Sequence, residues 1–398
     1  MIMQDNEKKP ALRFKGFTDP WEQRKLGEVF EEYSEKNHAE LPPLTIIQGG
    51  GTIRRDESER ALQYDKSSLS NYKMVNKDDF IVHLRSFEGG LEKASSQGII
   101  SPAYHTFHGE DVDSRFYYAY FRSKNFINKD LKPHVYGIRD GRSIDIEGMK
   151  TIRIPWASYP EQKSIGDFLT HLDTLITLHQ RKYEKLVNIK KSMLDKMFPQ
   201  NGASVPEIRF KGFTDPWEQR KVGTLIEDYT EKTVTQNQYP VLTSSQQQGI
   251  VLQEDYFADR QVTTDNNVGY YVLPKGYFTY RSRSDTDVFV FNRNNIVDKG
   301  IISYYYPVFA PKSCDSNFLL RRLNHGIKKQ LSMAAEGTGQ KVLAHAKFKN
   351  MAVDVPSQSE QEKIGTILEE LDTLITLHQR KLEKLQNIKK SCLEKMFV

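Results

Sequence analysis

The chain has 398 residues, of which 38% are hydrophobic and 11% aromatic, so it is long and apolar enough for two or more globular domains. Its two cysteines, Cys314 and Cys392, lie far apart, which excludes a disulfide framework and a multi-cysteine zinc site and favours a reducing cytoplasm. The N-terminus lacks the apolar core of a signal peptide, and no apolar run reaches the roughly 18 residues of a membrane span. The net charge of +5 is compatible with nucleic acid without being diagnostic.

The first feature along the chain is a segment whose sequence occurs twice. Arg13–Lys25 reads RFKGFTDPWEQRK, and the same residues return at Arg209–Lys221, 196 residues later. A second segment, LDTLITLHQRK, occupies Leu172–Lys182 and Leu371–Lys381, 199 residues apart. The chain is therefore one unit duplicated, and two copies predict a pseudo-two-fold rather than a solenoid, which needs at least three repeats.

Between the repeated segments lie two blocks that share little sequence. They contain short β-rich runs such as DDFIVHLRSF, TIRIPW, GYFTYRS and VFVFN, separated by Gly, Asn and Asp. Helical stretches intervene, such as SRFYYAYFRSKNFINKDL and SNFLLRRLNHGIKKQLSMAA. Each block is predicted to be an α/β globular domain whose last strand is closed by Pro155 or Pro356.

The repeated tails are predicted to be long helices. In the first tail, heptad position a holds Ile165, Leu172, His179, Leu186 and Met193, and the apolar stripe extends over positions d and e, as in the second tail. Ser158 with Glu161, and Ser357 with Glu360, match the capping box of a helix start. A helix of about 38 residues spans roughly 57 Å, and alone it would leave its apolar stripe exposed to water. We therefore expect the two helices to pack on each other, and copies related by a two-fold across their axes run antiparallel.

The stripe is interrupted by His179, Lys182 and Lys196 and by their counterparts in the second tail. We interpret them as residues at the edge of the seam that fix its register. A metal or switch role for the paired histidines is the alternative, but no second ligand lies at helical spacing.

The predicted fold class is α/β, with two globular domains separated by two long antiparallel coiled-coil helices in a pseudo-two-fold repeat. The predicted division is residues 1–157 for the first domain, 158–198 for the first helix, 199–356 for the second domain and 357–398 for the second helix.

The chain lacks the sequence motifs of common enzymes. It has no phosphate loop, no G-x-G-x-x-G opening a βαβ unit, and no H-E-x-x-H, G-x-S-x-G or Cys/His cluster. Glu161-Gln-Lys163 imitates part of a nuclease motif, but the second copy has Glu360-Gln-Glu362, so we interpret it as helix capping. The sequence favours a binding protein without catalytic residues.

The candidate contact loops of both blocks are rich in Arg, Lys, Gln, Ser and Tyr. Arg pairs with guanine and Gln with adenine in the major groove, while Lys, Ser and Tyr serve phosphates; the alternative is that these loop residues are simply solvated. The predicted DNA-binding residues are Arg54, Arg55, Arg85, Ser86, Tyr136, Arg139, Arg142, Ser245, Gln246, Gln247, Tyr280, Arg281, Arg283, Gln340 and Lys341.

The order FKGFTDPWEQRKLGEV, divergent block, IPWASYPEQKSIGDFLTHLDTLITLHQRK, and then the same again, resembles the specificity subunit of type I restriction–modification systems. The resemblance covers essentially the whole chain. It implies that each block reads one half of an asymmetric bipartite double-stranded DNA target and that the helices form a ruler between the halves.

The resemblance also implies the partners. The repeated segments would dock two modification (methyltransferase) subunits, which carry S-adenosylmethionine and methylate adenine, and restriction subunits with ATP and Mg would complete the endonuclease. This cytoplasmic chain itself would need no cofactor. The predicted docking and coiled-coil residues are Trp21, Trp217, Leu172, Leu175, Ile176, His179, Leu186, Leu371, Leu374, Ile375, His378 and Leu385, with local core packing as the alternative for the two tryptophans.

Two other functions stay open at this point. A coiled-coil scaffold could assemble two copies of a partner without binding DNA. An enzyme of the fused restriction type would need a catalytic part on a separate polypeptide, because this sequence begins directly with recognition-like residues.

Overall fold

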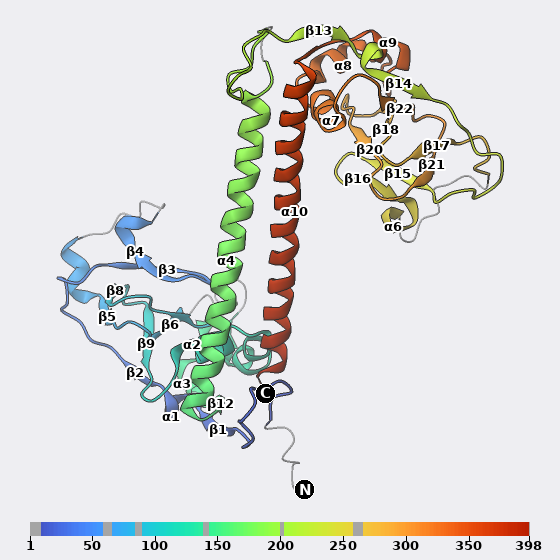
Figure 1. Cartoon of the computed structure of the whole chain (residues 1–398). Helices are drawn as coiled ribbons and strands as arrows, with labels where there is room; N and C mark the ends of the chain where they lie inside the picture. The colour runs from blue at the N-terminus through green and yellow to red at the C-terminus, as the bar shows by residue number, and fades with distance from the viewer. Residues whose placement is uncertain are drawn as a thin grey trace. The chain divides into compact units, whose positions relative to one another are not determined.

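A computed structural model describes residues 9–58, 66–83, 90–137, 143–199, 203–257 and 266–397. The chain forms two compact units, unit 1 with Met1–Gln180 and Arg380–Val398, and unit 2 with Arg181–Gln379 (Figure 1). Both units mix helices and strands, as the sequence predicts. No helix in the described part of the chain is long and apolar enough to cross a membrane.

Unit 1 contains short strands, short helices and helical turns, the first part of the long helix α4 and the last part of the long helix α10 (Gln358–Lys395). Its strands are β1 (Glu22–Lys25), β2 (Glu31–Tyr33), β3 (Leu44–Ile47), β4 (Gly51–Arg54), β5 (Lys73–Val75), β6 (Phe80–His83), β7 (Glu92–Lys93), β8 (Gly98–Ile100), β9 (Tyr104–His108), β10 (Val135–Tyr136), β11 (Ser143–Ile144) and β12 (Arg153–Trp156). Its helices are α1 (Leu26–Val29), α2 (Ser114–Phe121), α3 (Ile146–Lys150) and α4 (Tyr159–Lys196), with the turns η2 (Arg55–Glu57), η3 (Lys66–Asn71), η5 (Phe126–Leu131) and η6 (Lys132–His134).

Unit 2 follows a similar plan. Its strands are β13 (Glu218–Lys221), β14 (Ile226–Tyr229), β15 (Leu242–Ser245), β16 (Gly249–Leu252), β17 (Tyr271–Pro274), β18 (Phe278–Tyr280), β19 (Arg283–Ser284), β20 (Phe291–Arg293), β21 (Lys299–Ile302), β22 (Val308–Pro311), β23 (Lys341–Val342) and β24 (Ala352–Val355). Its helices are α5 (Val222–Leu225), α6 (Gln253–Phe257), α7 (Ser316–Asn324), α8 (Lys328–Ala334), α9 (His345–Asn350) and α10 (Gln358–Lys395).

The two divergent blocks share one strand topology although their sequences differ. Each has an antiparallel four-stranded sheet, in the order β2-β9-β6-β7 in unit 1 and β14-β22-β18-β20 in unit 2. A helix packs on each sheet, α2 through Phe116 and Phe121 and α7 through Phe318 and Leu319, and these side chains are fully buried. The shared topology follows because burial depends on where apolar residues recur and tolerates changes in their identity.

The repeated opening segment closes each unit at the start of its long helix. In unit 1, β1 pairs antiparallel with β12, the strand that leads directly into α4. The guanidinium of Arg13 donates two hydrogen bonds to the carboxylate of Glu161 in the first turn of α4, both 2.7 Å long. The indole N–H of Trp21 donates to the same carboxylate at 3.0 Å. Helix α4 starts where the capping-box pattern predicts it. The side chain of Glu161, which that pattern assigns to the helix cap, binds the opening segment.

Unit 2 repeats this closure with one difference. Strand β13 pairs with β24, and Arg209 donates to Glu360 at 2.8 and 2.7 Å. Trp217 is buried like Trp21, but its indole N–H has no acceptor among the described residues. The hydrogen bonds to the glutamates raise the pKa of both arginines. Both tryptophans therefore lie in the cores of their units, which is the packing alternative considered for them.

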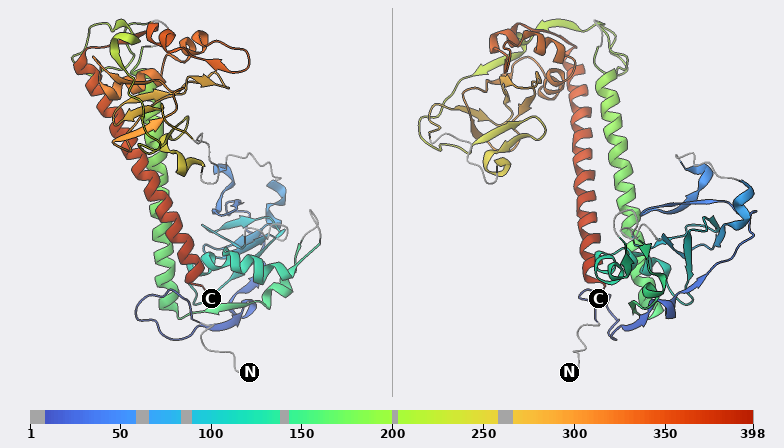
Figure 2. Two further views of the ribbon diagram at one scale, coloured as in Figure 1. Left: turned by 90° about the vertical axis from the view of Figure 1, so that its right-hand side faces the viewer. Right: turned by 180° about the vertical axis from the view of Figure 1, so that it is seen from behind.

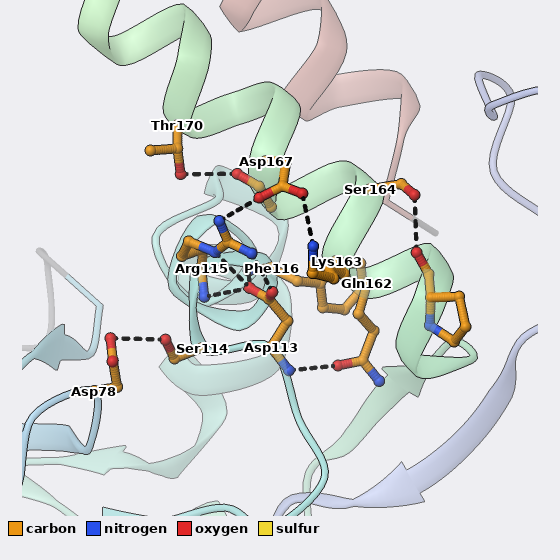
Figure 3. A network of polar contacts seen from close by, with 12 residues as sticks. Asp78, Asp113, Ser114, Arg115, Phe116, Gln162, Lys163, Ser164, Asp167 and Thr170 are labelled. Carbon is orange, nitrogen blue, oxygen red and sulfur yellow. Dashed lines mark hydrogen bonds and ion pairs between the residues drawn. The ribbon is translucent and has the colours of Figure 1, made fainter.

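The start of each long helix also binds the divergent block. The side-chain oxygen of Gln162 accepts a hydrogen bond from the backbone N–H of Asp113, the residue that caps α2 (Figure 3). The side-chain amide of Gln162 donates to the carbonyl of Ala157. Arg115 completes this network by pairing with Asp113 and Asp167. A Cβ added at Gly166 would lie 2.6 Å from Asp113 Oδ1, so only glycine fits here. In unit 2, Gln361, Gly365 and Asp315 form the same contact.

Within each unit the start of one long helix lies beside the end of the other, so the two helices are antiparallel there (Figures 1 and 2). In unit 1, Cys392, Met396 and Phe397 of the second tail share a core with Ile165 and Leu169 of the first. In unit 2, Met197 and Phe198 share a core with residues of α10, which are Ile364, Leu368 and Leu371. Matching ion pairs link the helices, Asp173 with Lys389 in unit 1 and Asp372 with Lys190 in unit 2.

Candidate nucleic-acid interface

A recess of about 490 Å³ in unit 2 brings together five of the predicted DNA-binding residues. It lies between the tip of the β15–β16 hairpin, helix α6 and the segment that leaves β18. The predicted residues that line it are Ser245, Gln246, Gln247, Arg281 and Arg283. Because they come from two segments far apart in sequence, only the packing of the hairpin on the sheet makes them neighbours.

The polar side chains in and beside this recess are held by specific partners. Asp285 accepts a hydrogen bond from the amide of Gln340 at 2.9 Å and pairs with Arg281 at 3.9 Å. The guanidinium of Arg283 lies over the ring of Tyr305, 4.4 Å from its centroid. Arg281 and Arg283 remain exposed, so this surface presents two cations and several amides to solvent.

Not every predicted residue of unit 2 faces outward. Tyr280 is fully buried, packs on Phe291 with ring centroids 4.8 Å apart, and has its hydroxyl 3.3 Å from His345 Nδ1. The prediction that Tyr280 contacts DNA is therefore wrong, because β18 turns this side chain into the core. Ser245 is also mostly buried, and its hydroxyl accepts from the backbone N–H groups of Gln247 and Gln248.

Two other predicted residues of unit 2 lie beside the recess. Lys341 stands in β23, which pairs with β19 so that Ser284 faces Lys341. Gln340 precedes that strand and reaches Asp285. Sequence reasoning missed Asp285, Asn292 and Tyr305. The run RSRSD could have suggested Asp285, but nothing local indicates the other two.

In unit 1 the structure describes Arg54, Arg55 and Tyr136 of the predicted residues. Arg54 is exposed at the end of β4 and pairs with Asp56 at 3.0 Å, and Arg55 lies against the ring of Tyr72. Tyr136 is 60% exposed in the β10–β11 hairpin. Arg85, Ser86, Arg139 and Arg142 lie outside the described residues.

A second recess, of about 260 Å³, lies in unit 1 but contains none of the predicted residues. Its lining includes Lys77, Asp79 and His108. Among the residues that the structure describes, no three His, Cys, Asp or Glu side chains gather into a group that could hold a metal ion.

The predicted seam residues of the long helices differ in burial. Leu172 and Leu371 are buried, whereas Leu175, Ile176, His179, Leu186, Ile375, His378 and Leu385 are half-buried. Leu374 is 42% exposed, and Ile189 and Ile388, at the same heptad position, are exposed to a similar extent. The seam thus follows positions a and e, and Leu374 lies on its flank, where its predicted docking role stays a prediction. Position d lies on the flank, where Leu178 and Leu377 are also exposed.

Two α/β blocks of different sequence stand on one repeated frame, and in unit 2 polar side chains gather beside a hairpin tip, an arrangement typical of a protein that binds its ligand through loops. The profile of the type I restriction modification DNA specificity domain matches residues 18–188 and again residues 215–387. The chain therefore belongs to the family of type I restriction–modification specificity subunits.

Curated relatives and a solved structure agree with this family. The chain is 22% identical over 353 residues to the type I restriction enzyme MjaVIII specificity subunit of Methanocaldococcus jannaschii, covering 80% of this chain and 77% of that protein. It is 20% identical over 400 residues to the putative MjaX specificity subunit of the same organism, covering 94% and 91%. The crystal structure of the type I system S subunit from M. genitalium shares the fold, with a TM-score of 0.59, 12% identity, and coverage of 98% and 99%.

Proposed function

We propose that this chain is the DNA-reading subunit of a type I restriction–modification complex, in which each unit reads one half of an asymmetric bipartite double-stranded target. The observation that carries this proposal is the recess of unit 2, where Gln246, Arg281 and Arg283 converge from separate segments. Arg and Gln are the side chains that pair bidentately with guanine and adenine in the major groove. Because the two blocks carry different residues on one topology, the two half-sites should differ in sequence.

The long helices are proposed to set the spacing between the half-sites and to dock two methyltransferase subunits. Each helix runs unbroken for 38 residues, and each carries exposed apolar side chains on its flank, such as Leu178 and Leu377. Apolar residues at repeated positions outside the seam are typical of a surface that a partner covers. The identical opening segments would make two equivalent docking surfaces for two copies of one partner.

The proposed chemistry belongs to the partners. The methyltransferase subunits would supply S-adenosylmethionine and methylate adenine, and restriction subunits would supply ATP-driven cleavage with Mg. This chain would bind and place the DNA without a cofactor of its own and without catalytic residues. Base flipping at the target adenine would then be the work of the methyltransferase.

The test is a methylome. The chain is co-expressed with its methyltransferase subunit in a host without adenine methylation, and modified adenines are mapped by long-read sequencing. A split motif of two different half-sites around a fixed spacer is the expected result. An intact complex that methylates nothing in the presence of S-adenosylmethionine would instead favour a scaffold that does not bind DNA.

The reading role of single side chains is tested by Arg283→Ala. Loss of a base-reading arginine should cost about 1–3 kcal/mol of binding free energy and relax one position of the motif. Lys299→Ala, which removes one charge from β21 outside the recess, is the control. If Arg283→Ala leaves both the motif and the affinity unchanged, its assignment as a reader is wrong.

A further inference from the structure

One position of the central sheet anchors the exposed hairpin in each unit. Glu92 of β7 pairs in register with Ile81 of β6, and Asn292 of β20 pairs with Thr279 of β18. Since β6 with β7 and β18 with β20 occupy the same places in the two four-stranded sheets, Glu92 and Asn292 are structurally equivalent. Both side chains are polar and buried, at 7% and 9% exposure, so each must find hydrogen-bond partners.

In unit 1 the anchor accepts hydrogen bonds from the loop of the β3–β4 hairpin. The carboxylate of Glu92 accepts from the backbone N–H of Gly49 at 2.7 Å and of Gly51 at 3.3 Å. Both glycines have a positive φ, which turns their N–H groups toward the carboxylate and which other residues rarely adopt. Tyr118 and Arg122 of the α2 region bind the same carboxylate and hold it in place.

In unit 2 the equivalent residue, Asn292, donates hydrogen bonds to its hairpin, whereas Glu92 accepts them. The amide of Asn292 donates to the hydroxyl of Ser244 and to the carbonyl of Ser245, both at 2.8 Å. The hydroxyl of Ser245 in turn accepts from the backbone of Gln247 and Gln248, so the loop with the predicted readers is fixed through one buried amide. The two units thus hold equivalent hairpins with unlike chemistry.

We propose that Glu92 and Asn292 are positioning residues that set the sequence preference of the two half-sites by fixing the β3–β4 and β15–β16 hairpins. The inference rests on the proposed function, which places the β15–β16 tip at the DNA, and it extends that placing to the structurally equivalent β3–β4 tip. Base readout needs donors and acceptors held within about 0.5 Å, so a loosened hairpin loses discrimination before it loses phosphate contacts.

The anchors can be removed without opening the main cores. The β3–β4 hairpin packs on a separate small cluster with Leu44, Val75 and Ile81, and the β15–β16 hairpin packs on one with Leu242 and Ile250. Neither cluster belongs to the large cores that join the sheets to the long helices. A change at either anchor should therefore act on the hairpin of its own unit.

The experiment compares the methylomes of complexes that carry Asn292→Ala or Glu92→Gln. The matched controls are Asn295→Ala and Glu110→Gln, which make the same chemical changes at exposed positions of the same units. We expect Asn292→Ala to raise methylation of sites with a mismatch in one half by about tenfold relative to the intact site, and Glu92→Gln to do so for the other half. The controls should keep the original motif.

Each outcome bears on the proposal. Because Glu92→Gln leaves Arg122 without its countercharge, the uncharged change Asn292→Ala provides a second and independent test. Variants that relax both halves equally, or that lower methylation everywhere without changing preference, would show a structural role and overturn the inference. A wild-type complex without a split motif refutes the proposed function as well. A wild-type split motif that neither variant alters refutes the inference alone.

Discussion

At the scale of single residues, buried polar side chains connect segments that lie far apart in the chain. Glu161 is 1% exposed and joins Arg13 and Trp21 to the start of α4, and Glu360 joins Arg209 to the start of α10. Removing one member of such a pair leaves a buried charge uncompensated, which typically costs about 3–5 kcal/mol. The cost explains why both copies of the opening segment carry an arginine at this position.

The unequal environments of the two tryptophans give a matched prediction. Trp21→Phe removes a hydrogen bond to a carboxylate, whereas Trp217→Phe removes an indole N–H that has no acceptor among the described residues. Because both changes remove a similar volume, Trp21→Phe should be the more destabilising by about 1–3 kcal/mol. Urea unfolding of the two variants, followed by fluorescence and circular dichroism, measures the difference. Equal losses would mean that the hydrogen bond of Trp21 contributes nothing net.

At the scale of elements, a short motif at the start of each long helix couples three segments. Glu161 holds the opening segment, Gln162 holds the N-terminus of α2, and Gly166 lets Asp113 approach the helix closely. The contact uses a backbone N–H and a capping aspartate, which both divergent blocks supply. The same frame can therefore carry two different blocks.

Replacing the helical glycine tests this coupling. Gly→Ala inside a helix normally stabilises by about 0.5–1 kcal/mol, but here the new Cβ would lie 2.6 Å from Asp113 Oδ1. We expect Gly166→Ala to destabilise unit 1 by about 1–3 kcal/mol instead. Thermal unfolding measures the change. Thr177→Ala, at an exposed position of the same helix, is the control and should be neutral or slightly stabilising.

A second pair of contacts ties the first strand of each sheet to the last short helix. In unit 1, Glu32 of β2 binds Lys150 of α3 and His105 of β9, both at 2.6 Å. Burial raises the pKa of Glu32, but the hydrogen bonds and charges of Lys150 and His105 outweigh it and lower the pKa overall. In unit 2, Lys349 and His345 likewise overcome the effect of burial and lower the pKa of Asp228.

These lowered values predict a pH dependence of stability. A carboxylate whose pKa is lower in the folded state contributes stability above its unfolded value and loses that contribution as the pH falls through its folded value. Glu32→Gln and Asp228→Asn should therefore lower stability at neutral pH and flatten its decline below about pH 4.5. Unfolding midpoints between pH 7 and pH 3 measure this. The exposed neighbours Glu31 and Glu227, changed to Gln, should leave the slope as it is.

At the scale of the whole molecule, each compact unit draws on both copies of the repeat. Phe397, from the second tail, packs on Trp21, Phe116 and Tyr120 of the first copy. Phe198, from the first tail, packs on Trp217 and Phe318 of the second copy. A backbone hydrogen bond also joins the two copies: the N–H of Leu12, in the first copy, donates to the carbonyl of Lys395, in the second. The folding units are therefore not the sequence repeats.

Hydrogen exchange can show which unit each phenylalanine supports. Phe397→Ala should increase amide exchange in β6 and β9 of unit 1, and Phe198→Ala in β18 and β22 of unit 2, with a loss of about 3–5 kcal/mol in each case. Each variant serves as the control for the other. If Phe397→Ala instead loosened the strands of unit 2, the assignment of the C-terminal residues to unit 1 would be contradicted.

Local sequence was informative wherever the structure of a segment depends on the pattern of its own residues. The heptad pattern predicted two long helices beginning after Ser158 and Ser357, and α4 and α10 begin at Tyr159 and Gln358. Gln246, Arg281 and Arg283 line one recess, and their contact with DNA stays a prediction. Tyr280 was misplaced on the surface, because the face that a strand side chain presents depends on strand register. Leu374 lies beside the seam and not in it, because that depends on how the helix is rotated against its partner.

By itself, the sequence determined the duplication, the long helices and the division into a constant frame and two divergent blocks, because identical segments and helical periodicity are local properties. Only the tertiary structure decided that Glu161 binds Arg13, that Glu92 and Asn292 anchor equivalent hairpins, and that the C-terminal residues complete the first core. These contacts join residues far apart in the chain. Their partners follow from strand pairing and close packing, which no short stretch of sequence encodes.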